Sequence, residues 1–258
     1  LLVGGKAPIL EGAQLGSVVV PFMPMKAPFS EIKEFIQKLW DVWGENGNNR
    51  ERIGEFMLRV GVGNFMESIG EAPLPPYIAR ESPNARDLAD YQTIFAREPG
   101  AVAAPTASLH FTRELASRLR VATVTLHVGP GTFRPIRCER LAEHRLEAER
   151  FCVPEATASA IAETRAAGGR VIAVGTTVVR ALETTGGAAG AGDTALLVLP
   201  GHEFRAVDSL ITNFHLPGSS LLALVMAFAG VEATKRAYAH AIAEKFRFFS
   251  YGDALWIR

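Results

Sequence analysis

The sequence has few cysteines and no long apolar run. Its two cysteines, Cys138 and Cys152, form neither a CxxC pair nor a Cys/His zinc spacing, which predicts reduced thiols in the cytoplasm. The apolar run at 221–230 is about half as long as a membrane span needs, and no signal-peptide pattern opens the chain. The 27 basic residues equal the 27 acidic ones, which argues against binding nucleic acid through bulk charge.

The length and composition suit a globular protein with an internal boundary. The chain has 258 residues, 48% of them hydrophobic, enough for one large domain or two small ones. It begins with Leu1 rather than methionine and reads as a fragment. The segment 72–87 carries four prolines and separates a strand (17–23) and two helices (28–43 and one from Asn48) from the rest of the chain. We therefore expect domains at 1–70 and 71–258.

The second part alternates between strand and helix patterns. Such alternation predicts an α/β fold with a mainly parallel sheet and flanking helices, preceded here by the small strand-plus-helices segment. We expect strands at 102–112, 121–129, 170–177, 194–200 and 209–217, and a flexible loop at 186–192. We expect helices at 113–120, 154–169, 178–184, 219–229 and 233–246.

Unusual polar residues follow four of these strands. Ligands of α/β sheets bind beyond the carboxyl ends of the strands, so these positions are candidate substrate contacts. They are His110 and Thr112; His127, Gly129, Gly131 and Thr132; Thr176 and Thr177; and Asn213, His215, Ser219 and Ser220. The three histidines share no metal-ligand spacing, and the glycines match neither a P-loop nor a GxGxxG fingerprint, so no metal site is expected.

Asn213 and His215 lie two residues apart at the end of a predicted strand. Residues at this spacing share a face of a strand, so we expect both side chains to point the same way. Ser219 or Ser220 would cap the next helix, whose free amides favour an anion. The imidazole suits general acid–base catalysis. The alternative is a core histidine beside serines that only cap.

Three further segments have both a functional and a structural interpretation. Thr176 or Thr177 is expected to cap a helix that carries Arg180, either beside a ligand or as a plain cap. The arginines of 134–150 alternate with glutamates, which fits a salt-bridged surface or a rim that contacts RNA phosphates. The aromatic tail 247–253 fits core packing or stacking on a base.

Seven segments, in this order, resemble the S-adenosylmethionine:tRNA ribosyltransferase-isomerase family of queuosine synthesis. They are 74-LPPYI-78, 91-YQTIFA-96, 103-AAPTASLHFT-112, 125-TLHVGPGTFRP-135, 172-IAVGTTVVRALE-183, 208-DSLITNFHLPGSSLLALV-225 and 248-FFSYGDA-254. The resemblance covers about residues 70–258.

The resemblance implies a reaction on tRNA. The ribosyl part of S-adenosylmethionine moves to an aminomethyl-deazaguanine base at the anticodon wobble position and rearranges to give epoxyqueuosine, while adenine and methionine leave. S-adenosylmethionine is then a co-substrate, no further cofactor is needed, and a cytoplasmic monomer is expected. His215 and Asn213 become catalytic candidates. The other positions above, with Arg180, Tyr251 and Asp253, become substrate-binding candidates.

Two departures from the family stand out. Its HxMHxE-like stretch is 144-HRLEAE-149 here, with Glu147 in place of the second histidine, and its first strands, an Asn-Asp-Thr motif and an inserted β-barrel lid are not found. Residues 1–70 instead resemble the carboxyl-terminal part of the dissimilatory sulfite reductase α subunit, although they lack the cysteines that sirohaem and iron–sulfur sites need. A fusion of two fragments, non-catalytic or derived from a sulfite reductase, is therefore the alternative.

Overall fold

The computed structural model describes residues 2–3, 17–18, 30–49, 51, 53–60, 90–98, 101, 103–128, 138 and 141–258. The chain divides into two compact units. Unit 1 comprises residues 1–92 and 97–103, and unit 2 comprises residues 93–96 and 104–258. The predicted boundary near residue 70 lies outside the described residues. In the described part of the chain, no helix is both long and apolar enough to cross a membrane.

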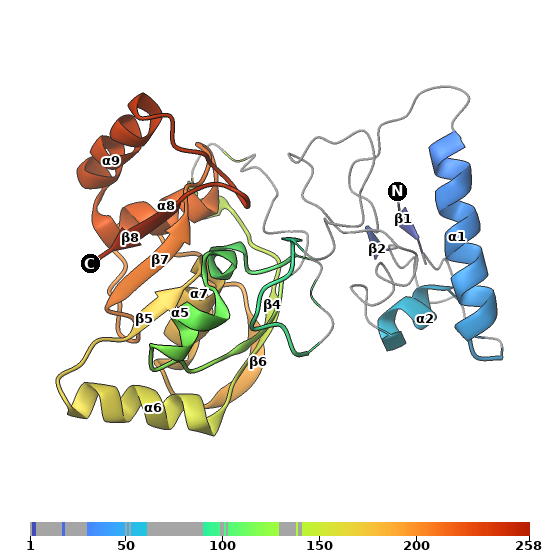
Figure 1. Cartoon of the computed structure of the whole chain (residues 1–258), viewed down its shortest axis with the longest axis horizontal. Helices are drawn as coiled ribbons and strands as arrows, with labels where there is room; N and C mark the ends of the chain where they lie inside the picture. The colour runs from blue at the N-terminus through green and yellow to red at the C-terminus, as the bar shows by residue number, and fades with distance from the viewer. Residues whose placement is uncertain are drawn as a thin grey trace. The chain divides into compact units, whose positions relative to one another are not determined.

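Unit 1 contains two helices and a short strand pair. Strands β1 (Leu2–Val3) and β2 (Ser17–Val18) are antiparallel, and helices α1 (Ser30–Asn46) and α2 (Ile53–Val60) follow (Figure 1). The predicted capping contact is present, because the Asn48 N–H donates to Glu51 Oε2 at 2.8 Å. The second helix nevertheless begins at Ile53, so its predicted start at Asn48 was wrong.

Unit 2 holds the elements that position the candidate site. Their order is η1 (Thr106–His110), α5 (Arg113–Ser117), β3 (Thr125–His127), η3 (Leu141–Glu143), β4 (Glu149–Val153), α6 (Glu155–Ala166), β5 (Ile172–Val174), α7 (Thr176–Thr185), β6 (Gly190–Thr194), β7 (Ser209–Asn213), α8 (Ser220–Ala229), α9 (Val231–Ala243) and β8 (Ala254–Ile257). From residue 154 onward, the predicted helices and the strands at 170–177 and 209–217 are confirmed in type, with shorter strands than expected.

The strands of unit 2 form two small sheets. One has the order β3-β4-β6 with both pairs antiparallel, and the other has the order β5-β7-β8. Strand β5 runs parallel to β7, whereas β8 is antiparallel to it. The prediction of a mainly parallel sheet was therefore wrong for the described strands. Parallel pairing needs a crossover, and among these pairs α7 belongs to the crossover that joins β5 to β7.

Two strand predictions were wrong for local reasons. Within 102–112, residues Thr106–His110 form the 3₁₀ turn η1, which starts after Pro105, and the Ser108 hydroxyl donates to the Pro105 carbonyl at 2.6 Å. The glycine-rich segment at 186–192, expected as a loop, supplies the start of β6, which pairs with β4 from Val153 to Glu149. Glycines can form these ladder bonds because the bonds involve only the backbone. The second wrong strand prediction is 194–200, since residues 195–200 lie outside any strand.

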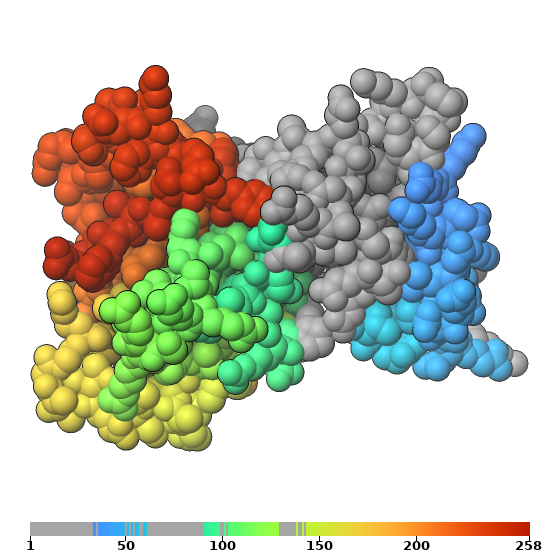
Figure 2. Space-filling model, viewed as in Figure 1, coloured from blue at the N-terminus to red at the C-terminus, as the bar shows by residue number. Residues whose placement is uncertain are grey.

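Helix α7 contacts strands of both sheets and is buried along most of its length. It touches β4, β5, β6 and β7, and its Val179 and Ala181 are fully buried. The core around it includes Phe151 of β4 and Leu210 of β7. A second cluster joins Phe214 to Tyr238 of α9. Strand β8 and the segment before it, drawn in red, lie at the surface of unit 2 (Figure 2).

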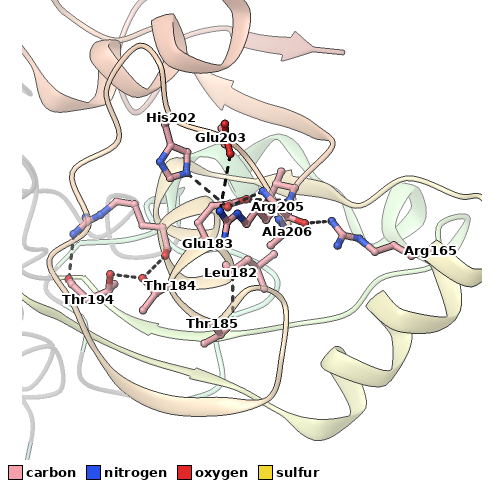
Figure 3. A network of polar contacts seen from close by, with 12 residues as sticks. Arg165, Leu182, Glu183, Thr184, Thr185, Thr194, His202, Glu203, Arg205 and Ala206 are labelled. Atoms are coloured by element: carbon pink, nitrogen blue, oxygen red, sulfur yellow. Dashed lines mark hydrogen bonds and ion pairs between the residues drawn. The ribbon is translucent and has the colours of Figure 1, made fainter.

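The carboxyl-terminal half of α7 also holds the loop that leads to β7. The carboxylate of Glu183 accepts backbone N–H groups of Arg205 (2.9 Å), Ala206 (2.9 Å) and Val207 (3.1 Å) (Figure 3). The side chain of Glu183 is 2% exposed, and His202 Nε2 lies 3.7 Å from its Oε2 atom. These three bonds hold the loop immediately before the start of β7.

Candidate active site

The carboxyl ends of β5 and β7 lie at the same edge of their sheet because the two strands are parallel. After β5, the Gly175 N–H donates to the Ile211 carbonyl of β7 at 2.8 Å, which joins the start of α7 to that strand. The turn η1 contacts β7. A Cβ placed on Gly175 would lie 3.8 Å from that of Ala107, so η1 and the start of α7 are also close.

Asn213 links three distant segments at this edge. Its Nδ2 donates to the Phe249 carbonyl at 3.0 Å and contacts His110 Nε2 at 3.1 Å, while its Oδ1 accepts the Thr106 hydroxyl at 3.4 Å. The residue is 3% exposed. Because a carbonyl can only accept, the bond to Phe249 fixes the orientation of the amide.

The orientation of the Asn213 amide determines the tautomer of His110. The second Nδ2 hydrogen faces His110 Nε2, so this nitrogen accepts and the proton of the neutral ring is on Nδ1. The pKa of His110 lies below its usual value, mainly because of burial. The nearby Arg247 lowers it further, and the Asp253 carboxylate opposes the shift without cancelling it. His110 is thus a neutral hydrogen-bond donor through Nδ1.

The tail turn 247–253 completes this side of the site. Asp253 accepts hydrogen bonds from the Arg247 backbone N–H at 2.7 Å and from the Arg247 guanidinium at 3.2 Å. Both bonds lower the pKa of Asp253, and the backbone bond has the larger effect. Phe249 has a φ of 70°, an uncommon value for a residue with a side chain, at the carbonyl that binds Asn213. Tyr251 lies half-buried in the same turn.

His215 does not share a face with Asn213, and that prediction was wrong. Strand β7 ends at Asn213, so its alternation stops there, and His215 Nε2 contacts the Thr212 hydroxyl at 2.9 Å. The His215 backbone N–H donates to the Tyr238 hydroxyl at 3.0 Å. Burial lowers the pKa of His215 to about 4, so the imidazole is neutral at pH 7.

Thr176 and Thr177 begin α7 but do not cap it. The cap position is Gly175, with a φ of 101° and no side-chain capping bond, so the predicted threonine cap was wrong. A side chain caps from the residue before the first helical turn, whereas both threonines lie inside it. Thr176 is 6% and Thr177 9% exposed.

Arg180 lies on α7 but is directed at the other sheet. Its Nη1 donates to Glu149 Oε2 at 2.7 Å, its Nε to the Leu196 carbonyl at 3.0 Å, and its Nη2 to the Thr194 carbonyl at 3.3 Å. The Arg180 and Glu149 side chains are 4% and 8% exposed. The structure therefore gives Arg180 a buried ion pair and does not bring it to the edge with Asn213.

The hydroxyl candidates Thr112 and Ser219 are helix caps. Thr112 accepts the Leu115 N–H at 3.1 Å at the start of α5. Ser219 accepts the Leu222 N–H at 3.2 Å, which confirms the predicted serine cap of α8, and donates to the Leu216 carbonyl at 2.7 Å. Ser220 follows as the first residue of α8.

His127 lies in the sheet β3-β4-β6, away from the edge that holds Asn213. It pairs with Arg150, which pairs in turn with Asp193, and these three residues line a pocket of about 310 Å³ together with Cys152. Gly129, Gly131 and Thr132, predicted to follow His127, lie outside the described residues.

The described edge thus brings together His110, Asn213, Asp253 and the two threonines of α7. Sequence reasoning missed Thr106 and the Phe249 carbonyl, although both lie within segments that carry the resemblance. It also missed Thr212 and Tyr238, which fix His215. In the described residues, no group of at least three histidines, cysteines or carboxylates is arranged to hold a metal ion.

A family model and the curated relatives of this chain indicate the same family. A family described as "Queuosine biosynthesis protein" matches residues 19–257. The S-adenosylmethionine:tRNA ribosyltransferase-isomerase of Thiobacillus denitrificans (strain ATCC 25259 / T1) is 56% identical over 203 residues, 75% of this chain and 59% of that protein. The chain spans about six tenths of the length of such curated relatives.

Two solved structures are also similar in part. The S-adenosylmethionine tRNA ribosyltransferase of Thermotoga maritima is 42% identical, covering 59% of this chain and 51% of that one, with a TM-score of 0.49. A dissimilatory sulfite reductase I is 46% identical, covering 32% of this chain and 19% of that one, with a TM-score of 0.26. With the family matched over residues 19–257, this chain belongs to the queuosine biosynthesis protein family.

Proposed function

We propose that this chain acts as an S-adenosylmethionine:tRNA ribosyltransferase-isomerase, with the activity in residues 71–258. In this reaction the ribosyl group of S-adenosylmethionine is transferred to the aminomethyl group of a deazaguanine base in the tRNA anticodon. It rearranges to the epoxy-cyclopentanediol of epoxyqueuosine, and adenine and methionine are released. S-adenosylmethionine serves as co-substrate without another cofactor, and the chain works as a monomer in the cytoplasm.

The observation that carries the proposal is the polar edge beyond β5 and β7. Asn213 joins η1, β7 and the tail turn there, next to the start of α7, which no side chain caps. S-adenosylmethionine offers ribose hydroxyl groups, the methionine carboxylate and adenine ring nitrogens, and the edge offers amide, imidazole and hydroxyl groups that match them. The location agrees with the general position of ligand sites in open α/β sheets.

The proposed roles follow from the hydrogen bonds. His110 has its proton on Nδ1, so it suits a donor to a ribose hydroxyl rather than a base. His215 is neutral, and when Nε2–H donates to Thr212, Nδ1 keeps a lone pair that can accept a proton. We assign proton abstraction to His215 and the orientation of His110 to Asn213. His127, Thr112, Gly129, Gly131, Thr132 and Tyr251 are proposed as further substrate contacts.

The test incubates the full chain with S-adenosylmethionine and tRNA that carries the aminomethyl-deazaguanine base. Mass spectrometry of digested tRNA detects epoxyqueuosine, and chromatography detects released adenine. We expect both products, formed in equal amounts. Their absence with a folded protein would reject the activity for this chain and favour a non-catalytic fusion fragment.

A pair of histidine variants separates the role of His215 from general damage. His215→Gln should lower turnover about 100-fold or more, the range of general acid–base catalysis, with a melting temperature close to that of the parent. The control is His240→Gln, at an exposed histidine of α9, which should retain turnover. An equal loss in both variants, or unfolding of the His215 variant alone, would contradict the assignment.

A further inference from the structure

The first turn of α7 presents backbone donors without intrahelical partners. The amide of Val179 makes the first bond of the helix, to the Gly175 carbonyl at 3.3 Å. The N–H groups of Thr176, Thr177 and Val178 precede it, and the first amides of a helix have no acceptor within it. These donors and the helix dipole give this end of α7 a partial positive charge that favours an anion.

A second feature at this end is a pair of threonines whose hydroxyl groups have no hydrogen-bond partner among the described residues. The side chains of Thr176 (6% exposed) and Thr177 (9% exposed) make no hydrogen bond within the part of the chain that the structure describes. On the same helix Thr184 donates to the Arg180 carbonyl at 2.8 Å, and Thr185 to the Leu182 carbonyl at 3.3 Å.

The hydroxyl of Thr177 lies over the start of the helix. Its Oγ1 is 3.8 Å from the position that a Cβ on Gly175 would take. Gly175 supplies no capping oxygen, in contrast to Ser219, which occupies an amide at the start of α8. No acceptor among the described residues takes up the first amides or the hydroxyl groups of this turn, so they can donate to a ligand.

We infer that the start of α7 binds a carboxylate, namely that of the methionine part of S-adenosylmethionine; this inference rests on the proposed function. Two hydroxyl donors and the adjacent amides match the two oxygens and single charge of a carboxylate. The cation of this helix, Arg180, is directed at Glu149. The bond from Gly175 to Ile211 places the subsite two residues along β7 from Asn213. The methionine end would thus lie beside the proposed reaction centre.

The experiment compares S-adenosylmethionine with decarboxylated S-adenosylmethionine, which retains the nucleoside and sulfonium but lacks the carboxylate. Isothermal titration calorimetry measures both dissociation constants for the full chain. The parent should bind the carboxylated compound at least about tenfold more tightly, as expected for charge-assisted hydrogen bonds. Thr176→Val and Thr177→Val keep the side-chain shape but remove the hydroxyl, so each should reduce this ratio, and the double variant should bring it near one.

Matched serine variants control for packing. Thr176→Ser and Thr177→Ser keep the hydroxyl and should keep the ratio, while circular dichroism verifies the fold of every variant. A ratio near one in the parent, or an unchanged ratio in the folded valine variants, overturns the carboxylate subsite. A loss of tRNA binding in the valine variants with an unchanged ratio overturns it in favour of a phosphate contact. If the parent binds neither compound, the proposed function itself fails.

Discussion

The buried pair of Arg180 and Glu149 provides the sharpest test of what α7 does. Arg180 was a substrate-binding candidate, but its guanidinium bonds the Glu149 carboxylate and two carbonyls of residues 194 and 196. Replacement by methionine would leave the Glu149 carboxylate, 8% exposed, without this cation and remove donors from both carbonyls. We therefore predict a large loss of stability and no specific loss of ligand affinity.

The expected magnitude follows from the burial of both charges. Breaking a buried ion pair by removing one partner costs about 3–5 kcal/mol, so Arg180→Met should lower the free energy of unfolding of unit 2 by that amount. Replacing both charged groups with apolar ones is often nearly neutral. Arg180→Met with Glu149→Leu should therefore be more stable than Arg180→Met alone, by about 1 kcal/mol or more.

The assay uses urea unfolding followed by tryptophan fluorescence. Trp40, Trp43 and Trp256 are the three tryptophans, so Trp40→Phe and Trp43→Phe leave only Trp256, on β8 of unit 2, as the reporter. Affinity for S-adenosylmethionine is measured on the folded variants. A loss under about 1 kcal/mol, the range of an exposed pair, together with weaker ligand binding would refute the reasoning and restore Arg180 as a ligand contact.

Four more changes test other parts of the structure. Gly175→Ala should cost about 1–3 kcal/mol because its φ of 101° suits glycine, whereas Gly192→Ala, with open space around it, should be nearly silent in the same urea assay. Glu183→Gln puts an amide donor against backbone donors, so hydrogen exchange at residues 205–207 should quicken; unchanged protection would contradict the clamp. Asn213→Asp should raise the pKa of His110 in NMR titrations, and an unchanged pKa would argue against their bond. Hydrogen bonds from Arg59 and from the Asn48 N–H lower the pKa of Glu51 from 4.5 to about 2, so Arg59→Met should raise the pKa of Glu51 towards 4.5. The contribution of the Arg59–Glu51 pair to stability is present above pH 4.5 and is lost as the pH falls towards 2.

Local patterns in the sequence predicted the helices of unit 2 well. The alanine-rich run 154–169 became α6 and the apolar run after Ser219 became α8 with its serine cap, because both signals depend on neighbours within a few residues. Strand pairing was predicted less well. Which strand lies beside β4 is decided by contacts between residues about 40 positions apart, such as Val153 and Gly190, and no local pattern encodes them.

The candidate site shows the same division between local and long-range information. The sequence placed polar residues after β5 and β7 correctly, since strand ends are local features. It placed Arg180 there as well, because helical position alone does not reveal that the side chain is directed at Glu149. Alternation also failed at His215, because β7 stops at Asn213 and the chain turns towards Thr212 and Tyr238.

Asn213 explains why the polar residues of 212-TNFHLPGSS-220 have separate roles. Its amide binds Phe249, which lies 36 positions further along the chain, and His110, which lies 103 positions before it, so a single side chain holds η1 and the tail turn against β7. A hydrophobic residue at this position would leave the Phe249 carbonyl and the His110 ring without that partner. His215, two residues on, instead contacts Thr212 and α9 and is free of this structural task. Asn213 therefore positions the edge, which is why we propose His215, and not Asn213, as the residue of this stretch that transfers a proton.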